Sequence, residues 1–183
     1  MTERYELDPA HTQIGFSAKH LGFTTVRGTF QSFSGWIEGD RGTLDVAGEV
    51  SVDVASATTG QPKRDGHLQS SDFFEVETYP RATYRITGAR KVGEGAYRID
   101  GELTLKATTR PLSLNAVVSG EIENPFQPGG RIVSVTATGE LNRMDFGVNW
   151  DGLAGAVPLA GHVIKLEIEA ELASAVQSLS EAS

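Results

Sequence analysis

The sequence predicts an all-β fold: an antiparallel β-barrel of about eight strands with one short helical segment near residues 62–75. Three observations predict it. Apolar and polar residues alternate with a period of two along most of the chain, glycine-rich turns separate the alternating segments, and hardly any of the sequence has a helical pattern. Strands with one apolar face must bury that face, and too little helix is available to cover it.

The alternation identifies the individual strands. In the first of them Ile14, Phe16 and Ala18 share one face, while Ser17 and Lys19 point the other way. Because short turns join many of these segments, we expect mainly antiparallel pairing. The segments with this pattern are residues 13–20, 46–55, 83–87, 97–106, 112–118, 133–141 and 164–170.

The turns and the unpaired edges favour a closed sheet. Glycine-rich turns at residues 38–42, 93–95 and 128–130 suit hairpin connections. An open sheet or sandwich leaves edge strands that can pair with other chains, and closure removes these edges. We therefore expect a barrel rather than a sandwich.

Two segments interrupt the alternation. Residues 61–76 contain Pro62, which suits the first turn of a short helix. Residues 144–159 are rich in glycine and proline and predict a long loop, a type of segment that often carries function. With no sign of a domain boundary, we expect one barrel domain over residues 1–172 and a flexible tail over residues 173–183.

Net charge restricts the expected partners, and the first residues of the chain indicate the expected compartment. The 183-residue chain has a formal net charge of −8 and no cysteine. An acidic chain repels nucleic acid and anionic membrane surfaces, so we expect neither as the main partner. No apolar run approaches the ~18 residues of a spanning helix. The first residues lack the basic start and apolar stretch of a secretory signal, so we expect a cytoplasmic protein.

The barrel interior has two interpretations at this point. A barrel of about eight strands is either filled by its own side chains or holds one small ligand. A filled barrel would act through its surface. A hollow barrel with these apolar faces would take an elongated apolar ligand, bound chiefly by burial at roughly 0.8 kcal/mol per CH₂.

Three motifs, in order along the chain, give the sequence a resemblance to the YceI-like family. The first resembles the opening of that family, the second its central motif and the third its C-terminal motif, and the likeness extends over about residues 5–172. The motifs are residues 8–20 with 26–30 and 33–35, residues 64–68 with 72–74 and 79–80, and residues 142–147.

The resemblance implies a lipocalin-like barrel that binds a long apolar lipid, of the polyisoprenoid, isoprenoid quinone or fatty amide type, for transport, storage or sequestration. It implies binding without enzymatic activity, and we expect no cofactor. The four histidines have no His-x₃-His or similar spacing, so we expect no metal site either. Many relatives carry a secretory signal and are periplasmic, and family members often pair, so a homodimer is also an expectation.

The expected ligand-binding residues combine the apolar strand faces with large or charged side chains in the motifs. His20, Arg27 and Arg143 are candidates for a polar head group, and the others are candidates for contact with the chain. The full set is Phe16, His20, Arg27, Phe30, Trp36, Phe73, Phe74, Tyr84, Leu103, Leu114, Val135, Arg143, Phe146 and Trp150.

The polar residues of the central motif support two readings. Arg64 and Asp65 suit charge-assisted hydrogen bonds that fix a helical lid, and His67 suits a strut bonded to Asp65 or to a loop carbonyl. The alternative is a hydrolase that uses His67 with Ser70, Ser71 or Asp72. Proximity in sequence does not make a catalytic triad, and the chain lacks a Gly-x-Ser-x-Gly motif.

Overall fold

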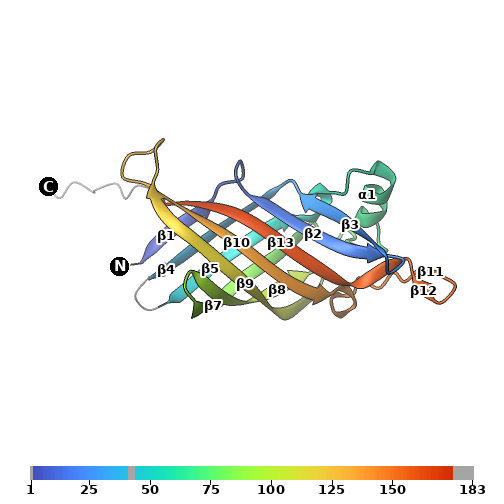
Figure 1. Ribbon diagram of the computed structural model, residues 1–183. Coiled ribbons are helices and arrows are strands. Elements are labelled where there is room, and N and C mark those ends of the chain that lie inside the picture. The colour runs from blue at the N-terminus through green and yellow to red at the C-terminus, as the bar shows by residue number, and fades with distance from the viewer. Residues whose placement is uncertain (1, 41–43, 175–183) are drawn as a thin grey trace.

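The computed structural model describes residues 2–40 and 44–174, which form a β-barrel with a short helix at one end (Figure 1). The strands are β1 (Glu3–Leu7), β2 (Gln13–His20), β3 (Thr24–Phe30), β4 (Phe33–Asp40), β5 (Asp45–Asp53), β6 (Ala57–Thr58), β7 (Arg81–Gly93), β8 (Ala96–Leu105), β9 (Thr108–Glu123), β10 (Arg131–Asn142), β11 (Leu153–Ala154), β12 (Val157–Pro158) and β13 (Ala160–Ser174). The helices are η1 (Val54–Ser56), α1 (Pro62–Gln69) and η2 (Arg143–Phe146).

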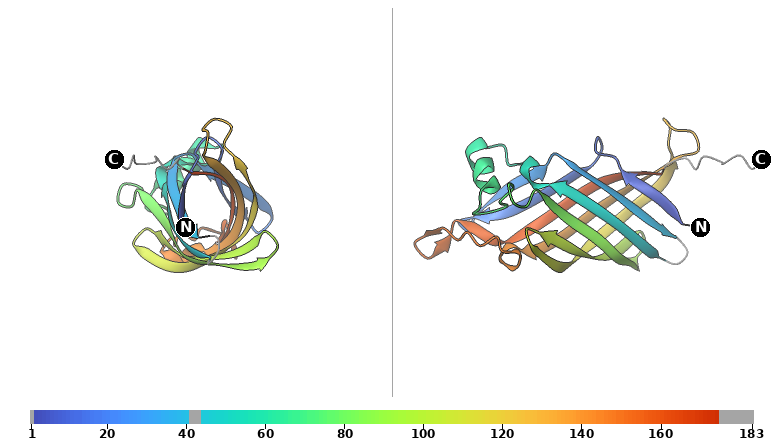
Figure 2. Two further views of the ribbon diagram at one scale, coloured as in Figure 1. Left: turned by 90° about the vertical axis from the view of Figure 1, so that its left-hand side faces the viewer. Right: turned by 180° about the vertical axis from the view of Figure 1, so that it is seen from behind.

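Eight strands close the barrel. Their order around the ring is β1, β4, β5, β7, β8, β9, β10 and β13, and β13 pairs back to β1. Each neighbouring pair is antiparallel. Seen end-on in Figure 2, the strands form a ring. The prediction of a closed antiparallel barrel of about eight strands is confirmed.

The two ends of the barrel are built differently. In Figure 1, α1 and the β11–β12 hairpin lie at the right-hand end, and the N-terminus lies at the left-hand end. We call these the α1 end and the opposite end. β13 pairs with β1 near its C-terminus and with β2 along its N-terminal part, and β2 continues the sheet through β3 to β6. The described strands leave β6 and β7 unpaired with each other, and loop residues close this gap.

The closing residues form an apolar cluster at the α1 end. Val54, Leu105, Phe146 and Val148 are buried there, and the side chains of residues 73, 74 and 76 pack against them. Full burial of one such side chain stabilises the fold by about 1.5–3 kcal/mol relative to leaving it exposed. This cluster therefore holds the segment after α1 against the end of the barrel.

One glycine allows an aromatic ring to lie flat on the sheet inside the barrel. Gly101 on β8 lies beneath the ring of Tyr84 on β7, and a Cβ atom at position 101 would come within 2.5 Å of Tyr84 Cζ and 2.6 Å of the Arg85 carbonyl oxygen. Glycine within a strand often marks such a close approach. The ring can therefore lie along the inner wall rather than across the barrel.

The helical segment is shorter than predicted. α1 begins at Pro62, and the Gln61 side chain caps it by accepting a hydrogen bond from the Arg64 N–H at 2.7 Å. It ends at Gln69 because Ser70 is extended and the next residues form successive turns, in which Glu75 has a positive φ of 53°. The prediction of helix as far as residue 75 is therefore too long.

The predicted loop and the predicted tail each contain regular structure. Within residues 144–159 the chain forms most of η2 and the small β11–β12 hairpin. β13 continues to Ser174, two residues into the expected tail, and the remainder of that tail lies outside the described residues. Among the described residues, no helix has the length and apolar character needed to span a membrane.

Candidate binding cavity in the barrel interior

The barrel is hollow. Its interior contains a cavity of about 490 Å³ whose wall is formed by inward-facing side chains of all eight strands of the ring. This volume lies in the ~300–1,000 Å³ range of small-molecule sites. Along β13, alternate residues from Ile164 to Leu172 line the cavity, so it extends roughly 25 Å along that strand at about 3.3 Å per residue.

The deep part of the cavity is apolar. Leu114, Val135 and Ile168 are typical of its wall. The one hydroxyl there among the described residues belongs to Tyr84, which donates a hydrogen bond to the Leu112 carbonyl oxygen at 2.9 Å. Burial raises the pKa of Tyr84 to about 12, with a smaller contribution from the Asp100 charge, so the phenol stays neutral. Because this hydroxyl already has a partner, the deep wall favours an apolar occupant.

The cavity opens at the α1 end. Among the described wall residues, those that are exposed to solvent are Lys19, His20 and Arg64, and all three lie at this end. The other polar wall residues except Tyr84 gather here too, namely Thr59, His67 and Arg143. The wall thus has a polar mouth and a long apolar interior.

Three ring side chains meet at the mouth. The His67 ring contacts Phe73 and Trp150 edge-on, each at 5.0 Å between centroids, and Phe73 and Trp150 are 5.4 Å apart. All three line the cavity. This mouth cluster joins α1, the segment after it and the loop that follows η2. It is the boundary between the polar opening and the apolar interior.

α1 is anchored to the barrel by its charged residues. Asp65 accepts hydrogen bonds from the Thr59 backbone and from the Thr58 and Thr59 hydroxyls. Burial acts against ionisation of Asp65, but the bonds from Thr59 and Thr58 outweigh it and hold its pKa below the usual range. Arg64 Nε donates to the Thr59 hydroxyl at 2.7 Å. These bonds fix the helix over the mouth, as the sequence predicted for Arg64 and Asp65.

His67 is a strut with a different partner from the one predicted. Its Nε2 lies 2.7 Å from Asp72 Oδ2, rather than near Asp65 or a loop carbonyl. The Ser70 hydroxyl donates to the backbone carbonyl of His67 at 2.7 Å and not to the ring. Among the described residues of this segment no serine hydroxyl is bonded to the His67 ring, so a Ser–His pair is not formed, whereas the His67–Asp72 pair is.

Arg143 is buried and holds the loop that follows η2. Only 3% of the residue is exposed, and its guanidinium donates to the carbonyl oxygens of Val148, Gly161 and Ala160 at 2.7, 3.0 and 3.1 Å. Burial lowers the pKa of Arg143, and the nearby Asp151 charge opposes this effect. Its donors are directed at the backbone, so Arg143 lines the mouth mainly as a structural residue.

Most of the residues expected to bind a ligand line this one cavity. The eleven that do are Phe16, His20, Phe30, Phe73, Phe74, Tyr84, Leu103, Leu114, Val135, Arg143 and Trp150. They come from six strands and from the segments at the α1 end. Phe16, Phe30 and Phe74 form a second aromatic series, with centroid separations of 5.1 and 6.0 Å.

Three expected residues lie outside the wall. Arg27 is exposed on the outer face of β3, because its neighbour Val26 takes the inward position. Trp36 faces outward under the Arg4 guanidinium, 4.3 Å from its ring, because the adjacent Ile37 faces inward. Phe146 is buried in the cluster that closes the α1 end and does not reach the cavity. Strand register, which requires knowledge of the pairing, decides the first two.

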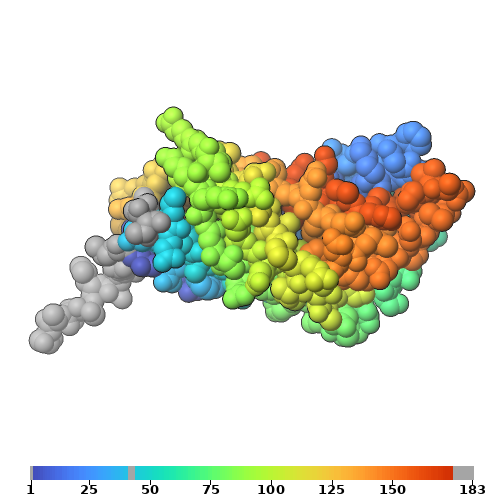
Figure 3. All heavy atoms as spheres, turned by 90° about the horizontal axis from the view of Figure 1, so that it is seen from below, coloured from blue at the N-terminus to red at the C-terminus, as the bar shows by residue number. Residues whose placement is uncertain are grey.

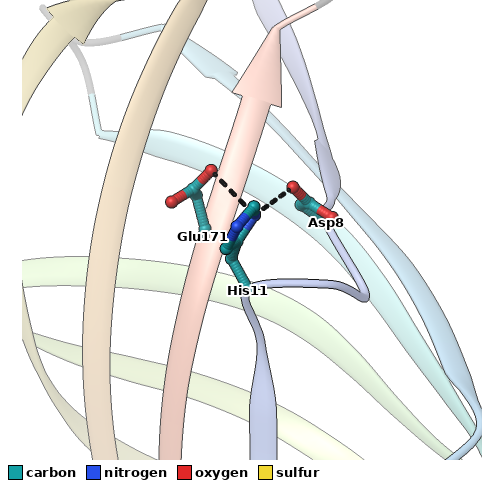
Figure 4. A group of neighbouring side chains, drawn as sticks. All are labelled: Asp8, His11 and Glu171. Carbon is teal, nitrogen blue, oxygen red and sulfur yellow. Dashed lines mark hydrogen bonds and ion pairs between the residues drawn. The ribbon is translucent and has the colours of Figure 1, made fainter.

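A charged cluster outside the cavity joins the β1–β2 turn to β13. His11 Nδ1 lies 2.8 Å from Asp8 Oδ2 and 3.6 Å from Glu171 Oε1 (Figure 4). The hydrogen bond that His11 donates to Asp8, and then the Glu171 charge, raise the pKa of His11, and the same bond lowers the pKa of Asp8. Three such atoms within 4.8 Å of one another resemble a cation site. However, the His11 ring itself occupies the position between the two carboxylates.

Comparison with known proteins identifies the family. The family model for the YceI-like domain matches residues 5–172. The chain belongs to the YceI-like family. A UPF0312 protein from Photorhabdus laumondii is 35% identical over 154 residues, which are 82% of this chain and 79% of that protein.

Solved structures have the same YceI-like fold. The YCEI protein of Campylobacter jejuni has a TM-score of 0.71 and 26% identity, over 84% of this chain and 87% of that one. A structure described as a polyisoprenoid binding domain from Saccharophagus degradans, implicated in plant cell wall breakdown, has a TM-score of 0.65. Its 16% identity covers 93% of this chain and 98% of that domain.

The motifs that resemble the YceI-like family lie mainly in the parts that close and brace the barrel. The first contains the Asp8–His11 pair and β2, the second contains α1 and the mouth cluster residues His67 and Phe73, and the third is η2 with Arg143. The deep apolar wall lies largely outside these motifs. Sequence motifs therefore point to the mouth and its supports, and alternation within strands points to the wall.

Proposed function

We propose that this YceI-like protein binds a long apolar lipid, of the isoprenoid, isoprenoid quinone or fatty amide type, inside the barrel without carrying out covalent chemistry. The supporting observation is the cavity itself, a long and almost wholly apolar interior with a polar opening at one end. Such a shape suits a chain that lies along the barrel with its polar group near the α1 end.

The fold comparison adds support of a different kind. The Saccharophagus degradans domain, which has this fold, is described as polyisoprenoid binding. A chain of repeated apolar units matches a wall with few polar atoms, because each methylene moved from water into the cavity contributes about 0.8 kcal/mol. Part of this gain is offset by the order imposed on the chain.

The hydrolase alternative has no comparable support. The Ser70 hydroxyl donates to a backbone carbonyl, and His67 is held by Asp72 and two aromatic rings. If the protein shows ester turnover and His67→Ala retains it, that turnover does not depend on His67, and the hydrolase alternative is contradicted. We propose that the protein transports, stores or sequesters the lipid.

The two tryptophans provide a direct test. Trp150 lines the cavity, whereas Trp36 faces outward. In a Trp36→Phe variant, added ubiquinone is expected to quench the remaining Trp150 fluorescence saturably. The matched Trp150→Phe variant keeps only the outer tryptophan and is expected to show weak, unsaturable quenching. Absence of saturable quenching in delipidated Trp36→Phe protein, together with no lipid recovered from the native protein, would contradict the proposal.

A further inference from the structure

Exposed large apolar side chains lie on two projecting segments at the α1 end, and others, among them Phe126, lie toward the opposite end. Phe23, at the tip of the β2–β3 turn, is 82% exposed, and on the β11–β12 hairpin Leu153 and Val157 are 56% and 41% exposed. In Figure 3 the β2–β3 turn (blue) and the hairpin segment (orange-red) lie at the same end of the molecule. Two separate projecting segments thus expose large apolar side chains to solvent at one end of the molecule. We call Phe23, Leu153 and Val157 the apolar rim.

The apolar rim borders the cavity opening. The Leu21 N–H donates to the Leu159 carbonyl oxygen at 3.3 Å, and the His20 ring lies 2.9 Å from the same oxygen, so the β2–β3 turn is joined to the base of the hairpin. His20, Leu159 and Lys19 are also wall residues of the cavity. The rim and the opening therefore belong to one continuous surface.

A cation lies directly behind the tip of the turn. Lys19 Nζ donates to the Phe23 carbonyl oxygen at 3.3 Å and to the Thr25 hydroxyl at 2.9 Å, which places its ammonium at the base of the turn. Arg27 is exposed one strand further on. An apolar tip with cations behind it is the arrangement of segments that lie at a membrane interface, with the ring among the acyl chains and the charge near the phosphates.

We propose that the α1 end docks on the surface of a lipid bilayer, with the apolar rim inserted, and that lipid passes between the bilayer and the cavity there. This inference rests on the proposed function, because the cavity occupant is then itself a bilayer component. Exposing a long apolar chain to water costs free energy for every methylene. An opening held against the bilayer removes that cost.

The net charge of the protein indicates whether the bilayer is anionic or zwitterionic. An acidic chain gains no long-range attraction from an anionic surface. The rim supplies apolar insertion, and Lys19 and Arg27 supply only local contacts with phosphate groups. We therefore expect docking on zwitterionic bilayers with weak dependence on salt. The expectation from net charge that an anionic membrane is not the main partner agrees with this form of docking.

The opposite end provides a matched control. Phe126, in the β9–β10 turn, is 90% exposed, so it presents at least as much apolar surface to solvent as Phe23 does. It lies at the end of the barrel away from the opening. If exposed aromatic surface alone caused membrane binding, Phe126→Ser would weaken it as much as a change in the rim. On our proposal, only the rim matters.

The experiment measures co-sedimentation of the full chain with phosphatidylcholine vesicles, with and without added phosphatidylglycerol. A Phe23→Ser/Leu153→Ser double variant is expected to lower the vesicle partition coefficient about tenfold or more. Phe126→Ser is expected to leave it unchanged. Because all three residues are exposed, thermal unfolding of the variants should match that of the native protein.

Each outcome separates the alternatives. Vesicle binding by the double variant equal to that of the native protein would overturn the proposal, as would a loss caused equally by Phe126→Ser. A native protein that carries lipid but does not bind vesicles would overturn the docking proposal and leave the proposed function standing. A native dimer that the double variant converts to a monomer, measured by light scattering, would assign the rim to a second copy of the chain and overturn bilayer docking.

Discussion

Replacing Ala137 by tryptophan tests where in the barrel a lipid chain lies. Ala137 lines the cavity on β10 and is paired with Ile168 on β13. On β13 the lining residues run from Ala160 and Gly161 at the mouth to Leu172, so Ile168 lies just beyond the middle of the cavity. An indole at position 137 therefore blocks the barrel about halfway along and leaves only the half nearest the mouth.

The magnitude follows from the length that is lost. The lining run on β13 spans roughly 25 Å along the strand, or about 20 Å along the barrel axis at a strand tilt near 40°. Exclusion of four methylenes, which span about half of the lost length, removes about 3 kcal/mol of burial. The dissociation constant for a long polyprenyl probe should therefore rise about a hundredfold, and that for a short probe should change much less.

The assay is a titration of delipidated protein with polyprenyl alcohols of increasing length. Thr138→Trp is the matched control, because residue 138 is exposed on the outer face of the same strand. Both variants should be shown to be folded by thermal unfolding before comparison. Equal affinity of Ala137→Trp and the native protein for the long probe would refute the placement of the chain in the barrel.

The remaining predictions concern stability. Tyr84→Phe removes one buried hydrogen bond and should lower the free energy of unfolding in urea by about 1 kcal/mol. Gly101→Ala places a Cβ against the Tyr84 ring and a backbone carbonyl, so it should lower the free energy of unfolding by about 1–3 kcal/mol. The control Gly120→Ala, with no atom within 4 Å of its Cβ, should change that free energy by less than about 0.5 kcal/mol. Equal effects would contradict the close approach of Tyr84 to Gly101. His11→Gln should lower the melting temperature at mildly acidic pH. There His11 is protonated, and the preference of the folded state for the proton, which the raised pKa expresses, stabilises the fold fully. The difference should disappear as pH rises through that pKa, and a difference that grows with pH would be the wrong sign.

Much of the fold could be predicted because the signal is local. In β2 the alternation from Gln13 to His20 defined the strand ends as the structure has them, and Phe16 was correctly placed toward the interior. Each strand of a barrel shows its buried face within a few residues. Closure also followed, because the unpaired apolar faces had no other cover.

What could not be predicted depends on contacts between distant parts of the chain. Trp36 was expected in the wall, and only the pairing of β4 with its neighbours shows that it faces outward. The pairing of His11 with Glu171 joins residues far apart in sequence. Arg143 was recognised from its motif as a site residue, but its carbonyl partners come from loop geometry that no sequence period encodes.

The central claim is that a lipid chain occupies the barrel, and native mass spectrometry of the freshly purified full chain tests it most directly. We predict a mass above that of the polypeptide by one lipid, which organic extraction releases as a long apolar molecule. We predict also that Ala137→Trp loses this adduct or retains a shorter one, while Thr138→Trp keeps it. A native protein at the bare polypeptide mass, which also takes up no added polyprenol, would contradict the account.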